Sequence, residues 1–297
     1  MATAFRQSSR GSGACITDFY DVGSRLGENT CGSGGEILHS KRTSDGAEFA
    51  VKKIAKLGSW EGKSQVMVLQ RLNQRNIVEM VDWFEDADNL FVVMELARGG
   101  DLFDKISNVG RMSENQAANI LSQILMAIKH MHSKHVIHCD IKPENILCMT
   151  SDEDVPVIKI ADFGFAQLAD QGCQAMKHQG TLTYSSPEII DGKAYDSKTD
   201  MWSLGVLLYS MLAGFAPFGQ HESRSRQMSK IRQCQISFNY QAFRSVSPDA
   251  IDLIRKLIVA SPQQRLSAAD ALRHPWVINN KKHSADMDAL TGQIKSL

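Results

Sequence analysis

The pattern of apolar and polar positions divides the chain into a first part of short strand-like runs and a later part of helical runs. Between residues 19 and 96, β-rich apolar runs alternate with Gly and Asp turns, and the clearest runs are 48–54 and 90–94. Residues 65–72 place apolar side chains at helical spacing between these two strands. The pattern therefore predicts a small β-sheet that carries one main helix.

After the glycine pair at 99–100 the pattern becomes helical. Residues 115–132 repeat isoleucine and leucine along one face, and residues 201–212 are apolar on nearly every side, which is typical of a buried helix. Ser247-Pro248 and Ser261-Pro262 are typical of helix starts, because serine caps the first turn and proline fits its first position. We expect an α+β chain in which a small β-rich lobe is joined to a larger helical lobe near 95–101.

Composition excludes several classes of protein. The chain has 297 residues, 43% of them hydrophobic, and a formal net charge of +0, so it can bury a sizeable core and shows no sign of a nucleic-acid partner. No apolar run approaches the ~18 residues of a membrane span, and Ala2 stands where N-myristoylation requires glycine. The six cysteines lack metal-ligand spacing, and residues 1–20 do not resemble a signal peptide, so we expect free thiols in a reducing compartment. These features predict a monomer of the cytoplasm, and also of the nucleus, without membrane partners.

One segment carries most of the candidate chemistry. Residues 138–147 read His-Cys-Asp-Ile-Lys-Pro-Glu-Asn-Ile-Leu, and residues 162–164 read Asp-Phe-Gly. Phosphoryl transfer needs a carboxylate that orients a hydroxyl, a cation near the transferred phosphate, and oxygen ligands for Mg²⁺. Both segments supply these groups in the order and spacing of a protein-kinase catalytic loop and metal-binding motif. The groups are Asp140, Lys142, Asn145 and Asp162.

Further motifs extend this likeness along the chain. Residues 158–166 read Ile-Lys-Ile-Ala-Asp-Phe-Gly-Phe-Ala, 180–188 read Gly-Thr-Leu-Thr-Tyr-Ser-Ser-Pro-Glu, and 200–206 read Asp-Met-Trp-Ser-Leu-Gly-Val. With Pro-Gln-Gln-Arg at 262–265 and His-Pro-Trp at 274–276, the chain resembles eukaryotic protein kinases of the calcium/calmodulin-dependent group. Within that group it is similar to the C-terminal kinase domains of MAP-kinase-activated kinases and to calcium-dependent protein kinases.

The resemblance implies a two-lobed kinase fold and a serine/threonine kinase that uses ATP and Mg²⁺. It places the kinase domain at 18–277, with an N-lobe at 18–96 and a C-lobe at 97–277, between a disordered arm at 1–17 and a tail at 278–297. Residues 1–17 fit this reading because they are Ser-, Gly- and Arg-rich without apolar periodicity.

The resemblance also implies a role for each matched residue. Asp140 would be the catalytic base and Lys142 the cation beside the γ-phosphate, while Asn145 and Asp162 would bind Mg²⁺. Lys52 would hold the α- and β-phosphates. Thr181 matches a position that contacts the catalytic aspartate and lysine, and Met94 matches the gatekeeper position. Glu188 and Arg265 match a buried ion pair that braces the helical lobe. The residues expected around ATP are Leu26, Gly27, Gly32, Gly34, Gly35, Ile37, Ala50, Lys52, Met94, Glu95, Ala97, Asp101 and Leu147.

Two acidic residues match positions that receive basic side chains upstream of the phosphoacceptor. These residues are Asp101 and Glu144, whereas a further acidic position is occupied by Ser210. The match predicts a preference for Arg or Lys three residues before the Ser or Thr. Surface acids are often merely solvated, and that alternative stays open.

The chain departs from the family pattern in its N-lobe. Residues 30–37 align with the glycine-rich loop, but Thr30 replaces its first glycine, and an insertion at 28–30 separates it from Leu26-Gly27. Backbone amides at the remaining glycines still provide phosphate ligands, so we expect weaker nucleotide binding. Gln65 replaces the helix glutamate that pairs with the strand lysine. Glu61 lies one helical turn earlier, and two interpretations are open for it. It either substitutes for the missing glutamate or is a solvated residue in a Gly-flanked loop.

The other departures concern regulation. Cys139 replaces an arginine that binds an activation-loop phosphate, and residues 165–179 contain no Ser, Thr or Tyr. We therefore expect activity without phosphorylation of that loop. Cys139 is either an inert buried thiol or, with Cys31 and Cys173, a site of thiol modification. Residues 277–297 are either a regulatory amphipathic helix that docks or binds a partner, or a frayed terminus.

We expect a working protein kinase, because Lys52, Asp140, Asn145 and Asp162 are all present. One alternative is a pseudokinase scaffold, which Gln65 and the altered glycine-rich loop favour. A small-molecule kinase is the other, although the 180–188 segment fits a peptide-binding region.

Overall fold

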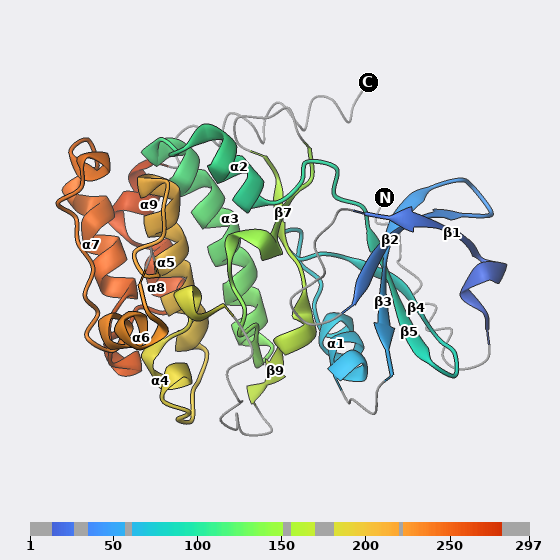
Figure 1. Cartoon of the computed structure of the whole chain (residues 1–297). Coiled ribbons are helices and arrows are strands. Elements are labelled where there is room, and N and C mark those ends of the chain that lie inside the picture. Colours follow the sequence, from blue (N-terminus) through green and yellow to red (C-terminus); the bar gives the residue numbers. More distant parts are fainter. Residues whose placement is uncertain are drawn as a thin grey trace.

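The structure, a computed structural model, describes residues 14–26, 35–56, 61–150, 156–169, 181–219 and 222–280. It consists of a β-sheet lobe and a larger helical lobe (Figure 1). This confirms the predicted α+β, two-lobed architecture. The expected insertion in the glycine-rich loop, most of the activation loop and the expected C-terminal helix lie outside the described residues.

The smaller lobe is a five-stranded antiparallel sheet in the order β1-β2-β3-β5-β4. The expected strands at 48–54 and 90–94 are confirmed as its neighbouring β3 and β5. Helix α1 packs against β4 and β5 through buried apolar side chains such as Leu69. The strands are β1 (Tyr20–Arg25), β2 (Glu36–Arg42), β3 (Glu48–Ala55), β4 (Met80–Glu85) and β5 (Asn89–Glu95), and the helix is α1 (Glu61–Gln70).

Two long helices form the centre of the larger lobe. α3 (Glu114–Ser133) begins at a capping box made by Ser113 and Gln116, and its isoleucine face is buried as predicted. α5 (Lys198–Ala213) is buried from its second residue onward, because its sequence is apolar all round. Shorter helices pack around them (Figure 1). These are α2 (Leu102–Val109), α4 (Pro187–Ile190), α6 (Arg224–Arg232), α7 (Pro248–Leu257), α8 (Ala268–Leu272) and α9 (Pro275–Asn280).

Short strands carry the loops that face the sheet lobe. β6 (Val136–Ile137) pairs with β9 (Gln167–Leu168), and β7 (Ile146–Cys148) pairs with β8 (Ile158–Ile160). The connection between the lobes is bound to β7, since Gly99 N donates to the carbonyl of Cys148 at 3.0 Å. A Cβ on Gly99 would lie 2.2 Å from the carbonyl oxygen of Thr150, so this close approach requires glycine.

Two boundaries differ from the sequence expectation. Ser247 caps α7 as expected, but Ser261 starts only a 3₁₀ turn, Pro262–Gln264, because its hydroxyl bonds the side chain of Gln263 instead of a backbone amide. The prediction that residues 1–17 form a disordered arm includes too many residues, since Ile16 begins a 3₁₀ helix and is buried against the sheet. No helix in the described part of the chain is long and apolar enough to cross a membrane.

Candidate active site between the lobes

The turn that carries the candidate catalytic residues is anchored by Asp200 of α5. The fully buried carboxylate of Asp200 accepts the backbone N–H of His138 at 3.0 Å and that of Cys139 at 2.9 Å. The ring of His132 contacts the same carboxylate at 2.9 Å. Burial alone would raise the pKa of Asp200, but the hydrogen bond from His132 and the neighbouring groups hold it below its ordinary value. These bonds fix Cys139 in a left-handed backbone conformation at φ 66°.

Sequence reasoning treated Asp200 only as part of a family motif and missed its partners. The signal that could have found them is an acid at the head of a helix that is otherwise apolar, because a buried carboxylate must find hydrogen-bond donors.

Three of the predicted catalytic residues meet in one hydrogen-bonded group. The carboxylate of Asp140 accepts Lys142 Nζ at 2.8 Å and Asn145 Nδ2 at 2.9 Å. Asn145 also donates to the backbone carbonyl of Asp140 at 2.7 Å. The 3₁₀ turn Pro143–Asn145 folds the chain back so that residues only five positions apart are in contact. All three side chains are buried. The carboxylate is therefore held in one orientation before any substrate arrives.

The remaining cation and acid come from opposite lobes. Lys52 of β3 is buried, and its Nζ lies 2.7 Å from Asp162 Oδ1. Asp162 adopts a left-handed conformation with φ 57°, and the next residue, Phe163, is buried against the ring of His138 at 4.8 Å. The pair Lys52–Asp162 thus connects the sheet lobe to the Asp-Phe-Gly segment of the helical lobe.

Gln65 occupies the position of the expected glutamate and contacts the same lysine. Lys52 Nζ donates to Gln65 Oε1 at 3.2 Å, as predicted for a neutral amide. The Nε2 of Gln65 is buried and finds no hydrogen-bond partner among the described residues. Glu61 is the first residue of α1 and not part of a loop, so that alternative is wrong, while the position of its side chain lies outside the described residues.

The residues expected around adenine line the junction of the lobes. Ala50 is paired with Met94 across β3 and β5, and Ile37 is paired with Lys52 across β2 and β3. Leu26 N donates to the carbonyl of Ile37 at 2.8 Å. The structure thus places Ile37, Ala50 and Met94 on the neighbouring inner strands β2, β3 and β5. On the helical side, Leu147 lies in β7 and forms a bridge with Asp101, while Ala97 belongs to the connection between the lobes.

The side chain of Glu95 is held by contacts other than those expected with adenine. Its carboxylate contacts Lys159 Nζ at 2.5 Å and the backbone N–H of Glu79 at 2.7 Å. The contact of adenine with the backbone of this connection stays a prediction. Gly27, Gly32 and Gly34 lie outside the described residues.

The described residues fit a nucleotide with Mg²⁺. Gly35 has φ 153°, and a Cβ there would lie 3.2 Å from Lys52 Cε and 3.1 Å from the carbonyl of Lys53. The absent side chain keeps the surface above Lys52 open for a phosphate. The amide oxygen of Asn145 and the carboxylate of Asp162 are the kind of oxygen ligands that Mg²⁺ prefers.

Asp101 and Glu144 are acids without a cationic partner among the described residues. Asp101 caps α2, and burial raises its pKa. Burial also raises the pKa of Glu144, and the charges of Asp101 and Asp140 act in the same direction. Glu144 Oε2 is buried and has no hydrogen-bond partner in the described part of the chain. Ser210, at the third substrate position, donates to the carbonyl of Val206 within α5 at 2.9 Å.

Thr181 does not join the catalytic group in this structure. It is exposed, and its hydroxyl forms no hydrogen bond with Asp140 or Lys142. The predicted brace is present, since Arg265 contacts both carboxylate oxygens of Glu188 at 2.8 and 3.2 Å inside the lobe.

Cys139 is partly exposed, so the interpretation of an inert buried thiol is wrong. Its Sγ lies 3.8 Å from the hydroxyl of Tyr195 and 3.7 Å from the carbonyl of Ile137. Cys31 and Cys173 lie outside the described residues, so the structure does not bring the three cysteines together.

Comparisons with known proteins agree with this geometry. The family model for the protein kinase domain matches residues 20–277. A probable myosin light chain kinase of Dictyostelium discoideum is 33% identical over 302 aligned positions, which cover 99% of this chain and 76% of that protein. The human calcium/calmodulin-dependent protein kinase type IV is 36% identical over 281 positions, or 94% of this chain and 59% of the relative.

Calcium-dependent protein kinase 29 of Arabidopsis thaliana is 37% identical over 273 positions, or 90% of this chain and 50% of the relative. The chain thus spans only about half to three quarters of the length of these relatives. Because the family model covers most of the chain and includes every residue of the site, the chain belongs to the protein kinase family, in its group of calcium/calmodulin-dependent-type serine/threonine kinases.

Proposed function

We propose that the chain is a catalytically active kinase that transfers the γ-phosphate of ATP to Ser or Thr of protein substrates. The observation that carries this proposal is the hydrogen-bonded group of Asp140, Lys142 and Asn145, together with the Lys52–Asp162 pair. A site assembled this completely supports catalysis even though Gln65 replaces an acid.

Each side chain has a task that its contacts support. Asp140 orients the substrate hydroxyl and accepts its proton, and Lys142 neutralises charge on the transferred group. Lys52 holds the α- and β-phosphates, and Asn145 and Asp162 are the ligands for Mg²⁺. The bound metal supplies charge neutralisation at the phosphates.

The direct test is transfer of labelled γ-phosphate to an Arg-x-x-Ser peptide, with Asp140→Asn as the matched variant. Transfer by the wild type that falls at least about 10²-fold in the variant supports a working kinase. The competing function is a nucleotide-binding scaffold, which the neutral Gln65 favours. If neither protein phosphorylates peptide, protein or itself, while Mg²⁺-ATP raises the melting temperature of both, the scaffold replaces our proposal.

The substrate preference that we propose is an Arg or Lys three residues before the phosphoacceptor. Burial raises the pKa of Glu144, and the nearby charge of Asp101 acts in the same direction, while the buried Glu144 Oε2 has no hydrogen-bond partner among the described residues. An arginine side chain would satisfy that oxygen. A positional peptide library checks this preference, and equal rates with Arg and Ala at that position would refute it.

We also propose that activity does not require a phosphorylated activation loop. The turn at Cys139 is held by Asp200 and His132 from within the helical lobe, and residues 165–179 contain no hydroxyl group. Phosphatase-treated enzyme should therefore keep its full rate. Stoichiometric phosphate at Thr183 that raises the rate would overturn the proposal.

Regulation through the tail is a separate proposal. The relatives' names include calcium and calmodulin, and residues 278–297 are the segment of this chain available for a regulatory partner. Removal of residues 281–297 should raise the peptide phosphorylation rate if this segment inhibits, and an unchanged rate would exclude that role.

A further inference from the structure

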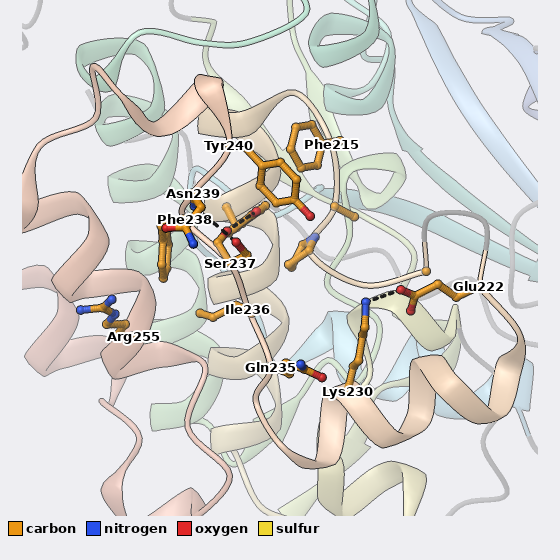
Figure 2. A pocket seen from close by; sticks show the side chains of 14 residues that line it. Phe215, Glu222, Lys230, Gln235, Ile236, Ser237, Phe238, Asn239, Tyr240 and Arg255 are labelled. Carbon is orange, nitrogen blue, oxygen red and sulfur yellow. Dashed lines mark hydrogen bonds and ion pairs between the residues drawn. The ribbon is translucent and has the colours of Figure 1, made fainter.

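A pocket of about 490 Å³ lies on the helical lobe, lined by none of the residues of the active site (Figure 2). Its walls are formed by residues of the segment 215–219, by Lys230 of α6 and by the irregular segment 235–240, and Tyr209 of α5 also lines it. The hydroxyl of Tyr209 donates to the carbonyl of Ser237 at 2.8 Å, so the core of the lobe holds one wall of the pocket in place. The pocket is therefore a formed feature of the lobe.

Aromatic rings give the pocket a site for an apolar side chain. The ring of Phe215 meets that of Tyr240 edge to face, with centroids 5.1 Å apart. Tyr240 is 51% exposed, which is unusual for a large ring beside a pocket. A side chain such as Phe or Leu would cover this exposed surface.

The same wall has free backbone donors. Asn239 N donates to the hydroxyl of Ser237, but the N–H groups of Phe238 and Tyr240 donate no hydrogen bond within the described part of the chain. An extended peptide beside this segment would accept hydrogen bonds from them. The wall thus fits a main chain as well as a side chain.

The charged residues that line the pocket are Lys230, Arg255 and Glu222, so two cations stand against one acid, although the chain has a net charge of +0. Lys230 is paired with Glu222 across the pocket, as Figure 2 shows. Arg255 lies over the ring of Phe238 at 5.1 Å, and Arg226 is one turn before Lys230 on the same face of α6. Neither arginine has a carboxylate partner among the residues that the structure describes. An acidic segment would complete this arrangement.

Helix α6 is also tied to the segment that leads to the active site. Gln227 Nε2 donates to Thr183 Oγ1 at 3.1 Å, and Arg232 Nε lies 2.7 Å from Asp191 Oδ1 just after α4. The pocket and the 180–188 segment therefore belong to one braced unit. Tyr184, beside Thr183, lies close enough to Glu144 for the charge of that carboxylate to act on it, so this unit adjoins one of the residues that we propose bind the substrate.

We propose that this pocket docks an acidic segment of protein substrates that carries one aromatic or large aliphatic side chain. This proposal rests on the proposed function, because a protein bound in the pocket is a substrate only if the chain is an active kinase. Docking would add affinity outside the phosphorylated sequence, and it would leave the chemistry at Asp140 unchanged.

The binding test uses a fluorescein-labelled peptide, Gly-Ser-Asp-Glu-Phe-Asp-Glu-Ser, and fluorescence anisotropy. We expect saturable binding that weakens about tenfold or more in the double variant Arg226→Glu, Arg255→Glu. Lys129→Glu is the matched control, because Lys129 is an exposed cation on α3 away from the pocket. Replacing Phe by Ser in the peptide should weaken binding similarly. Absent binding, or equal affinity in both proteins, would overturn the proposal.

The kinetic test joins an Arg-x-x-Ser acceptor to the same acidic segment through a flexible Gly-Ser linker. In the wild type and in Lys129→Glu, the joined peptide should have a KM about tenfold lower than the unlinked acceptor, at unchanged kcat. In the double variant, the two peptides should have the same KM. All three proteins should phosphorylate the unlinked acceptor equally, which shows that they are folded. If none transfers phosphate, the proposed function fails while the anisotropy still tests the pocket. Binding that appears only after removal of residues 281–297 would assign the pocket to the chain's own tail and refute substrate docking.

Discussion

The two halves of the active site differ in how completely their buried polar groups are satisfied. In the helical lobe, the Asp200 carboxylate receives two backbone N–H groups and the ring of His132, and Asp140 is bound by Lys142 and Asn145. His132 belongs to α3 and Asp200 to α5, so two long helices hold the turn at 138–139. The catalytic half is therefore set before substrate binds.

In the sheet lobe, the nucleotide half contains a buried amide that is only partly used. Gln65 accepts one hydrogen bond from Lys52, while its Nε2 has no partner among the described residues. A neutral oxygen holds an ammonium less strongly than a carboxylate does. The comparison teaches that the turn carrying Asp140 is firmly held, whereas Lys52, the lysine that we propose binds phosphate, is held less strongly by Gln65 than it would be by a carboxylate. Changes in the first half should cost stability, and changes in the second should alter nucleotide use.

The largest effect should follow from Asp200→Ala. Removing this carboxylate leaves two backbone N–H groups buried without acceptors, so we expect a loss of about 3–5 kcal/mol in unfolding free energy. Urea denaturation measures it. Lys256→Ala is the control, because Lys256 is half exposed and pairs with Asp252 at the surface, where a pair contributes about 0–1 kcal/mol. Equal losses in both variants would contradict the special role of Asp200.

The next effect concerns pH and the same carboxylate. Because the folded protein holds the pKa of Asp200 below its ordinary value, its contribution is present above the unfolded pKa of about 3.9 and is lost as pH falls through the folded pKa. Asp200→Asn removes this titration. The stability gap between wild type and Asp200→Asn, which we expect to be about 1–3 kcal/mol at neutral pH, should shrink below about pH 4. Thermal melts across acidic pH check this, and a constant gap would refute it.

Glu144 is an exception inside the well-satisfied half, because one of its buried oxygens has no hydrogen-bond partner among the described residues. Glu144→Gln should reduce the preference for Arg over Ala upstream of the phosphoacceptor about tenfold in kcat/KM. Since burial raises the pKa of Glu144, KM for the Arg peptide should increase as pH falls toward that pKa, while KM for the Ala peptide should not. Peptide kinetics at several pH values measure both. An unchanged preference in Glu144→Gln would assign recognition to other residues.

How far the sequence predicted this site depended on the range of the interactions. Asp140, Lys142 and Asn145 meet within one short turn, so their spacing was enough to place them together. Lys52 and Asp162 are far apart in the chain, and only the family resemblance placed them together. Buried helices and strands were predicted correctly because apolar periodicity is a local signal.

The failures were of a different kind. The contact of Asp200 with the backbone of the catalytic turn depends on tertiary packing, which no local pattern encodes. Ser261-Pro262 does begin a helical turn, but this is a 3₁₀ turn of three residues, and the Ser261 hydroxyl bonds the side chain of Gln263 instead of a backbone amide. Thr181 was placed by analogy beside Asp140, and the described structure does not show that contact.

In the nucleotide half, substitutions at Gln65 should produce a graded series. Gln65→Glu adds an ionic acceptor for Lys52, and Gln65→Leu removes the acceptor, so kcat/KM for ATP should rise and fall respectively by about fivefold, or about 1 kcal/mol. Steady-state kinetics with varied ATP measure the series, and Mg²⁺-ATP thermal shifts should follow the same order. If the Glu and Leu variants had the same kcat/KM for ATP, Gln65 would contribute only packing and would not position Lys52.

The smallest effect should come from Cys139→Arg, which restores the basic residue of the resembled kinases. Asp200 already fixes the backbone of this turn, and residues 165–179 offer no hydroxyl that could carry a phosphate for the new arginine. The peptide phosphorylation rate should therefore stay within about twofold of the wild type, a difference of about 0.4 kcal/mol. Phosphatase-treated and untreated enzyme should agree for both proteins. A large gain that phosphatase removes would show that the catalytic turn still depends on an anion from outside the helical lobe, and the rigid half of the site would then be less complete than its buried bonds indicate.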